Sequence, residues 1–159
     1  MMFRQLRRKD KELSHNECIE ILKNEKRGVL SVIGENGYPY GMPMNHFYNE
    51  EDGKLYFHCG RGGHRLDALM KDARVCFCTY DKGYRLPDNW PLYIKSVIVF
   101  GRIRVVEDRD RIADITTRLS YKFIQDDEHI KSEIEKYIDA TLLLELTPDH
   151  LCGKLVEES

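Results

Sequence analysis

Residues 54–69, KLYFHCGRGGHRLDAL, carry the chain from a strand into a helix through a glycine-rich turn. The start is apolar and aromatic, as in a strand, and the end predicts Leu66, Leu69 and Met70 on one helix face. Cationic side chains crowd the junction: His58, Arg61, His64 and Arg65. Helix N–H groups and the positive end of the helix dipole point at such a turn, and glycine lets a ligand approach the backbone. The segment therefore predicts a site for a phosphorylated ligand.

The other elements do not alternate between strand and helix as in a doubly wound sheet. Ser14 and Glu17 form a capping box, which predicts a first helix that ends before Gly28. Further helices are predicted after Asp108 and across residues 130–138. Strands are predicted at residues 29–33, 38–48, 55–57, 75–80, 93–106 and 142–146. The expected fold is mainly β or α+β, an antiparallel barrel or sandwich with peripheral helices.

The segment 38–48 is an unusual strand because it contains Pro39 and Pro43. The two prolines have equal parity, so both remove N–H donors from the same edge, and that edge cannot pair fully with a neighbour. One face of this strand is expected to carry Tyr40, Met42, Met44 and His46. The segment therefore predicts a single strand with an open or bulged edge, whose free backbone groups are available to a ligand.

Two features concern the later strands. Gly101 interrupts the segment 93–106 and predicts a bulge, while residues 97–100 are apolar on both faces and are expected to be covered on both sides. Pro148 and Asp149 are predicted to turn the chain out of its last strand. The residues that follow, His150 among them, are then expected to form a short exposed tail.

Composition restricts the class of protein. The length of 159 residues, 42% hydrophobic and 33% charged, predicts a single domain over 1–159. The net charge of −2 predicts no general attraction to nucleic acid. Residues 1–13 are basic and are expected to form a solvated or dimer-contacting arm. The sequence contains neither a membrane-spanning run nor a signal-peptide pattern, so a cytoplasmic location is expected. The five cysteines form no CxxC pair and are expected to be free thiols.

Four blocks of sequence, in this order, resemble a known family: GYPYGMPMNHFYN, LYFHCGRGGHRLDAL, RVCFCTYD and SVIVFGRIRVVED. The chain resembles the flavin-binding split β-barrel family, which contains pyridoxamine 5′-phosphate oxidases and nitroimidazole-resistance-type flavoproteins. The resemblance runs from about residue 14 to residue 154 and suits the smaller, nitroimidazole-resistance-like branch. It implies an antiparallel split β-barrel with peripheral helices and a homodimer with FMN at the subunit interface.

The resemblance also implies the cofactor-binding residues: Met42, Pro43, Met44 and Asn45 along the flavin ring; His58 and Cys59 at the strand end; Gly63, His64 and Arg65 at the phosphate; Ser96 and Val97 facing the ring from the partner subunit. The chain departs from the family in two ways. The phosphate pair is His-Arg, where the family often has Arg-Lys. The C-terminal GKLVEES lacks the arginine- and tryptophan-rich segment of true pyridoxamine-phosphate oxidases, so vitamin B6 oxidation is not expected.

The expected activity is that of an FMN-dependent oxidoreductase, in which reduced flavin passes electrons to a small nitroaromatic or quinone-like acceptor. If a general acid acts, the candidate is His58. The alternative is a flavin-binding protein without turnover, a sensor or carrier; a haem or deazaflavin cofactor, as some relatives use, ranks lower. No metal is expected, because the candidate ligands His46, His58, Cys59 and His64 have no characteristic spacing. Trp90 and Tyr93 could either cover the flavin or anchor a loop.

Overall fold

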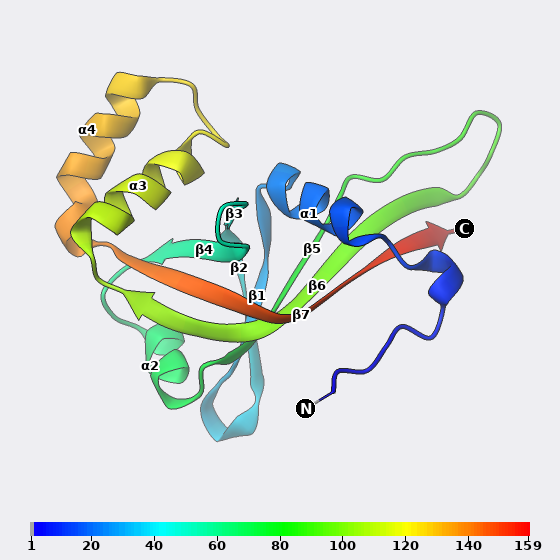
Figure 1. Ribbon diagram of the computed structural model, residues 1–159, viewed down its shortest axis with the longest axis horizontal. Helices are drawn as coiled ribbons and strands as arrows, with labels where there is room; N and C mark the ends of the chain where they lie inside the picture. Colours follow the sequence, from blue (N-terminus) through cyan, green and yellow to red (C-terminus); the bar gives the residue numbers. More distant parts are fainter. Residues whose placement is uncertain (1) are drawn as a thin grey trace.

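Seven strands form one curled antiparallel sheet in the order β2-β1-β5-β6-β7-β4-β3 in the computed structural model, which describes residues 2–159 (Figure 1). The strands are β1 Arg27–Ile33, β2 Pro39–Asn45, β3 Phe47–Asn49, β4 Lys54–Cys59, β5 Arg74–Tyr80, β6 Leu92–Val106 and β7 Leu142–Glu158. All neighbouring strands are antiparallel. The sheet confirms the predicted antiparallel, mainly β architecture.

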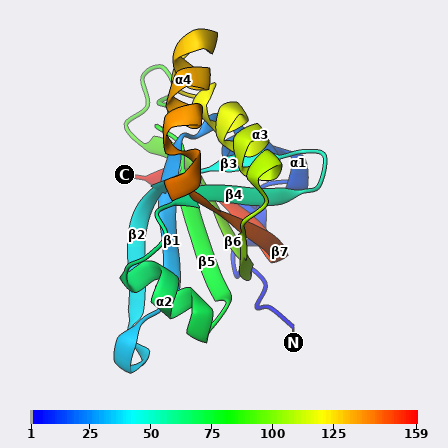
Figure 2. The same ribbon diagram turned by 90° about the vertical axis from the view of Figure 1, so that its left-hand side faces the viewer.

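Four α-helices surround the sheet: α1 His15–Asn24, α2 His64–Lys71, α3 Arg109–Ser120 and α4 Asp127–Tyr137. Helices α3 and α4 stack at one end of the sheet, and α1 lies over the long strands (Figure 1). Figure 2 shows α2 beside the ends of β1 and β5. Ser14 caps α1 through the predicted capping box with Glu17, and Asp108 caps α3. No helix among residues 2–159 has both the length and the apolar character needed to cross a membrane.

Two apolar clusters join the helices to the sheet. The larger one packs α1 and α2 against the inner face of the sheet, with Leu22, Leu30 and Phe77 wholly buried. The smaller one fixes α3 to the ends of the long strands through Ile112, Ile115, Tyr56, Val106 and Leu143. Burial of such side chains stabilises the fold by about 1.5–3 kcal/mol each. The second cluster thus holds the α3–α4 pair over the end of β4.

The prediction of one strand across residues 38–48 is wrong, because the chain breaks at His46. Strand β2 before the break pairs with β1, whereas β3 after it pairs with β4 at the opposite edge of the sheet. His46 is fully buried; its backbone N–H bonds to the Lys26 carbonyl, and its ring Nε2 lies 2.8 Å from the Leu22 carbonyl. These two bonds hold the corner where the chain leaves one sheet edge for the other.

The prediction that Pro148 ends the last strand is also wrong, since β7 runs from Leu142 to Glu158. The β6–β7 register shifts beside Gly101 as predicted, but the extra residue belongs to β7: Phe100 pairs with His150 and Gly101 with Pro148, which leaves Asp149 unpaired. A bulge tolerates a proline because the ladder is already interrupted there. His150 consequently lies in the sheet, where its ring stacks on Phe3 at a centroid distance of 5.1 Å.

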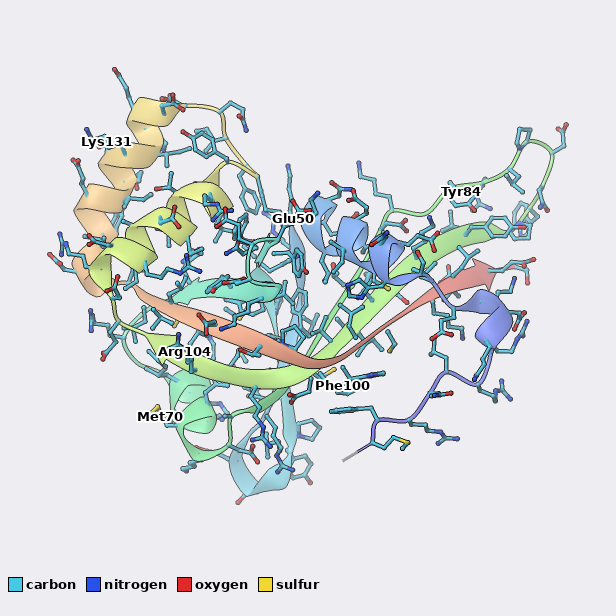
Figure 3. All side chains as sticks on the ribbon, viewed as in Figure 1. Glu50, Met70, Tyr84, Phe100, Arg104 and Lys131 are labelled. Atoms are coloured by element: carbon cyan, nitrogen blue, oxygen red, sulfur yellow. The ribbon has the colours of Figure 1, made fainter. Side chains whose placement is uncertain are left out.

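Helix α2 turns a different face to the core than the one predicted from the sequence of residues 54–69. Ala68 and Leu69 are buried and Leu66 is half-buried, as expected for neighbours on one stripe. Met70 is 75% exposed and projects from the outer side of the helix (Figure 3). The inner face of α2 is therefore completed by Arg65, one turn before Leu69, and not by Met70.

Candidate functional site

A cavity of about 670 Å³ opens where β2 ends and where β4 runs into the turn before α2. Its lining residues come from four parts of the chain: Arg27 of β1; Pro43, Met44 and Asn45 of β2; His58, Cys59, Gly60 and Arg65 of β4, the turn and α2; and Tyr137, Ala140 and Thr141 at the end of α4 and just after it. The predicted site residues that meet here are Pro43, Met44, Asn45, His58, Cys59 and Arg65. The turn and the proline-containing strand thus contribute to one site.

The topology explains why these segments converge. Strand β2 lies at one edge of the sheet, and β4 lies next to the other edge, yet the curled sheet brings the two into contact. Strand β2 pairs with β1 along its whole length, from Ile33–Pro39 to Arg27–Asn45, and its other edge has no strand partner among residues 2–159. The predicted open edge is confirmed. Its backbone groups border the cavity at Pro43–Asn45.

Two guanidinium groups make the cavity electropositive. Arg65 Nη1 lies 3.7 Å from Met44 Sδ, and the Arg27 guanidinium lies over the Phe123 ring at 5.3 Å. Within residues 2–159 neither arginine forms an ion pair, and no carboxylate lines the cavity. Two cations without a protein counter-ion favour an anionic ligand such as a phosphate.

Arg27 was not among the residues predicted from the sequence, although a signal for it existed. The Glu35–Gly37 turn, in which Asn36 and Gly37 have positive φ, joins β1 directly to β2. Counting outward from this turn along the antiparallel register places Arg27 opposite Asn45. A hairpin register thus assigns the cation at the start of β1 to the same site as Asn45.

The glycine turn leaves room for a ligand. An added Cβ at Gly60 or Gly62 would meet no heavy atom within 4 Å, so the space beside the backbone is open. Gly63 has φ +108°, which side-chain-bearing residues rarely adopt, and it is the N-cap of α2 without a side-chain cap bond. The first N–H groups of the helix are therefore available to an anion, as the sequence predicted.

His64 does not join Arg65 in the cavity. Its ring stacks on Tyr40 with centroids 4.4 Å apart and borders a separate cavity of about 130 Å³ beside Gly34 and Asp67. Successive helix residues point about 100° apart, and here Arg65 faces the cavity while His64 faces Tyr40. Arg65 thus shares the cavity with Arg27, and the phosphate contact predicted for His64 stays a prediction.

The remaining predicted site residues lie outside the cavity. Met42 is buried in the main core, and Val97 is wholly buried there. Ser96, on the opposite face of β6 from Val97, is half-buried between Tyr80 and Lys154 in the strand register. The contact predicted for Ser96 and Val97 involves a second subunit and stays a prediction.

His58 and Cys59 are both uncharged near neutral pH. The surrounding walls partly desolvate His58, although its side chain remains exposed at the cavity mouth, and this lowers its pKa; the nearby Arg65 cation lowers the pKa further. Burial raises the pKa of the Cys59 thiol, and this outweighs the opposite effect of Arg65. Cys59 is thus a thiol and not a thiolate nucleophile. No group of three His, Cys, Asp or Glu side chains suited to a metal gathers anywhere in residues 2–159.

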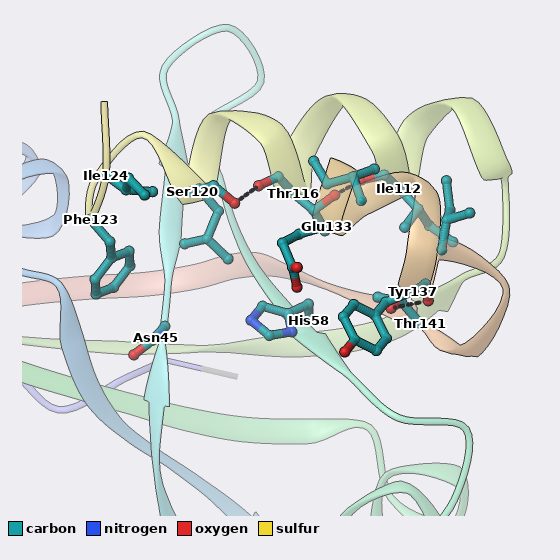
Figure 4. A pocket seen from close by; sticks show the side chains of 13 residues that line it. Asn45, His58, Ile112, Thr116, Ser120, Phe123, Ile124, Glu133, Tyr137 and Thr141 are labelled. Atoms are coloured by element: carbon teal, nitrogen blue, oxygen red, sulfur yellow. Dashed lines mark hydrogen bonds between the residues drawn. The ribbon is translucent and has the colours of Figure 1, made fainter. Parts of the chain in front are cut away.

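A second, smaller cavity of about 250 Å³ adjoins the first beneath α3 and α4 (Figure 4). The two share Asn45, His58, Tyr137 and Thr141 as lining residues. Sequence reasoning missed this cavity. The sequence feature that indicates this cavity is the apolar pair Phe123 and Ile124, which follows the end of α3. In the structure each of these side chains lines the cavity and is 37% exposed.

Comparison with known proteins agrees with this architecture. A family model described as Pyridoxamine 5′-phosphate oxidase matches residues 14–155. A conserved hypothetical protein from Mycobacterium tuberculosis superposes with a TM-score of 0.79 at 17% identity, covering 94% of this chain and 90% of that one. A candidate 5-nitroimidazole antibiotic resistance protein from Bacteroides thetaiotaomicron gives 0.76 at 17% identity, with 92% and 87% covered.

A third solved structure, a FAD-binding protein from Mesorhizobium loti, gives a TM-score of 0.68 at 19% identity and covers 92% of this chain and 97% of that one. At such identities the likeness establishes the fold. A search of curated proteins found no match.

Proposed function

The chain belongs to the pyridoxamine 5′-phosphate oxidase family, and from that premise we propose that it is an FMN-dependent oxidoreductase that passes electrons from reduced flavin to a small acceptor. The observation that carries the proposal is the large cavity with two unpaired arginines beside a glycine turn. A nucleotide flavin combines a phosphate with a broad ring. The cavity combines an anion site with an open strand edge.

The residues of the cavity fit FMN in a definite orientation. Arg65, Arg27 and the free N–H groups at the start of α2 would hold the phosphate. The open edge at Pro43–Asn45 would border the ring. One cluster of two guanidiniums suits the single phosphate group of FMN. The FAD-binding protein from Mesorhizobium loti, which has the same fold, supports a flavin as the cofactor class.

The bound flavin supplies the hydride or electron transfer, and the protein binds and orients it. His58 is neutral near pH 7 and lies at the junction of the two cavities, where it can form a hydrogen bond without adding charge. Cys59, as a thiol, contributes packing and a weak hydrogen bond. The reaction needs no acid–base pair from the chain.

Flavin loading and turnover test the proposal. The purified protein should bind FMN. With NADH or NADPH as donor, it should also reduce a nitroaromatic acceptor in steady state, and the falling absorbance of the reduced nicotinamide measures this turnover. Retention of FMN without turnover across donors and a broad acceptor panel would assign the protein to the alternative, a flavin carrier or sensor. Failure to bind FMN or any other flavin would refute both.

We also propose that the protein forms a homodimer with the flavin at the interface. Supporting this, one face of the sheet is covered less fully than residues 97–100 predict, although the Phe3 ring stacks on Phe100 there. Val97 and Val99 are buried, but Ile98 and Phe100 are only half-buried. The strand register continues this outer face across Val29, Cys78, Ile98 and Cys152, and Val29 is 42% exposed. An apolar row of this kind suits a self-complementary contact.

Light scattering should give twice the chain mass of 18.8 kDa for the FMN-bound protein. Val29→Asp introduces a charge into the apolar row and should give the single-chain mass together with weaker FMN retention. A wild-type protein that has the single-chain mass and still binds FMN tightly would contradict the interface proposal.

A further inference from the structure

The cavity beneath α3 and α4 has the features of a binding pocket in its own right. It measures about 250 Å³ and is walled mainly by apolar side chains: Ile112, Leu119, Phe123, Ile124, Ile134 and Ile138. An apolar cavity of about 150 Å³ is enough for a benzene ring. The volume therefore suits one substituted aromatic ring.

Three hydroxyl groups of this pocket already use their protons within the protein. The hydroxyls of Thr116, Ser120 and Thr141 donate to the backbone carbonyls of Ile112, Thr116 and Tyr137 at 2.6, 2.7 and 2.8 Å. These three hydroxyls therefore present only lone pairs to a ligand. The carboxylate of Glu133 points toward His58 across the pocket (Figure 4) and has no hydrogen-bond or ion-pair partner among residues 2–159. An unpaired carboxylate in an apolar pocket favours a cationic partner.

The two adjoining cavities thus have opposite charge. The larger one is lined by Arg27 and Arg65, whereas Glu133 is the one acidic or basic residue of the smaller apart from the shared His58. A cation is repelled from the first and attracted to the second, while a phosphate behaves in the opposite way.

We propose that the α3–α4 pocket binds a single-ring aromatic molecule that carries a cationic group, with the ring among the isoleucines and the cation at Glu133. His58 belongs to both cavities, so the ligand lies next to the cofactor cavity. We further infer that this ligand is the substrate of the flavin, and this step alone rests on the proposed function. Its binding to the pocket does not.

The test compares benzylammonium with its neutral analogue benzyl alcohol, by calorimetric titration of the full chain with and without FMN. Wild-type protein should bind benzylammonium more tightly. Glu133→Gln should weaken benzylammonium binding about tenfold, the size of one charge-assisted contact, and leave benzyl alcohol and FMN affinity unchanged. The matched control is Glu135→Gln, because Glu135 is an exposed residue of the same helix that lies outside the pocket.

A second variant tests the pocket by volume. Thr116→Leu adds bulk at a half-buried lining position and should weaken both probes, while FMN affinity stays at the wild-type value. The proposal is overturned if neither probe binds, if the two glutamine variants weaken benzylammonium equally, or if Thr116→Leu binds both probes as wild type does. Probe binding that responds as expected in a protein that binds no flavin would uphold the pocket and refute the proposed function.

Discussion

Replacing Arg65 with alanine is expected to weaken FMN binding about ten- to a hundredfold, and replacing Arg27 and Arg65 together about a thousandfold or more. Each guanidinium would make a charge-assisted contact worth about 1.5–3 kcal/mol, and about 1.4 kcal/mol is a factor of ten in affinity. The double variant should lose more affinity than either single variant, but two arginines that share one phosphate are not expected to add strictly. Quenching of flavin fluorescence during titration measures the dissociation constants.

Two control variants separate a specific site from general positive charge. Arg61 belongs to the same turn but donates to the Asp139 carbonyl at 2.7 Å and does not line the cavity, so Arg61→Ala should bind FMN nearly as wild type does. His64→Ala should cost less than Arg27→Ala, because His64 stacks on Tyr40 outside the cavity. Equal losses in Arg61→Ala and Arg65→Ala, or unchanged affinity in Arg65→Ala, would exclude the phosphate assignment.

The sequence was informative where the determinant of structure is local. The Ser14–Glu17 capping box and the register shift beside Gly101 form as predicted, because each depends on residues that are neighbours in the chain or on a single backbone preference. The glycines and Arg65 before and in α2 lie beside a cavity, and the anion site predicted there stays a prediction. The sequence alone does not tell which of these cations faces the cavity, because that depends on the helix geometry that separates His64 from Arg65.

Sequence reasoning failed where the outcome depends on partners far away in the chain. Local rules predict that Pro148 ends a strand, yet it lies within β7, opposite Gly101, where the β6–β7 register shifts. The break at His46 is set by the carbonyls of Leu22 and Lys26, which no local pattern reveals. The α3–α4 pocket likewise depends on where the helical pair docks, since its walls come from α3, α4 and the end of β4. Long-range packing decides these features.

The free energy of unfolding should fall steeply with acid below pH 6.5, because of His46. Burial, together with the Lys122 cation, lowers the pKa of His46 to about 3, and the bond to the Leu22 carbonyl opposes them only in part. Since that carbonyl can only accept, Nε2 carries the proton, and Nδ1 has no partner among residues 2–159. The folded protein thus holds a neutral imidazole, whereas the unfolded chain has a histidine of pKa about 6.5.

The direction of the effect follows from proton uptake. Above pH 6.5 neither state binds the proton, and the stability from neutral His46 is fully present. Between pH 6.5 and about 3 only the unfolded chain binds it, so the free energy of unfolding falls by about 1.4 kcal/mol per pH unit, about 4–5 kcal/mol over the whole window. His46→Gln retains an N–H donor for the Leu22 carbonyl but does not titrate.

Urea unfolding at pH 7.5, 6.5, 5.8 and 5.0 measures this contribution. Between pH 6.5 and 5.0 wild type should lose about 2 kcal/mol more than His46→Gln, because the carboxylates titrate alike in both proteins and cancel in the difference. His129→Gln, at an exposed position of α4, should follow the wild-type curve. Parallel curves for wild type and His46→Gln would mean that the His46 corner admits a proton in the folded state, and that the junction between β2 and β3 is open to water.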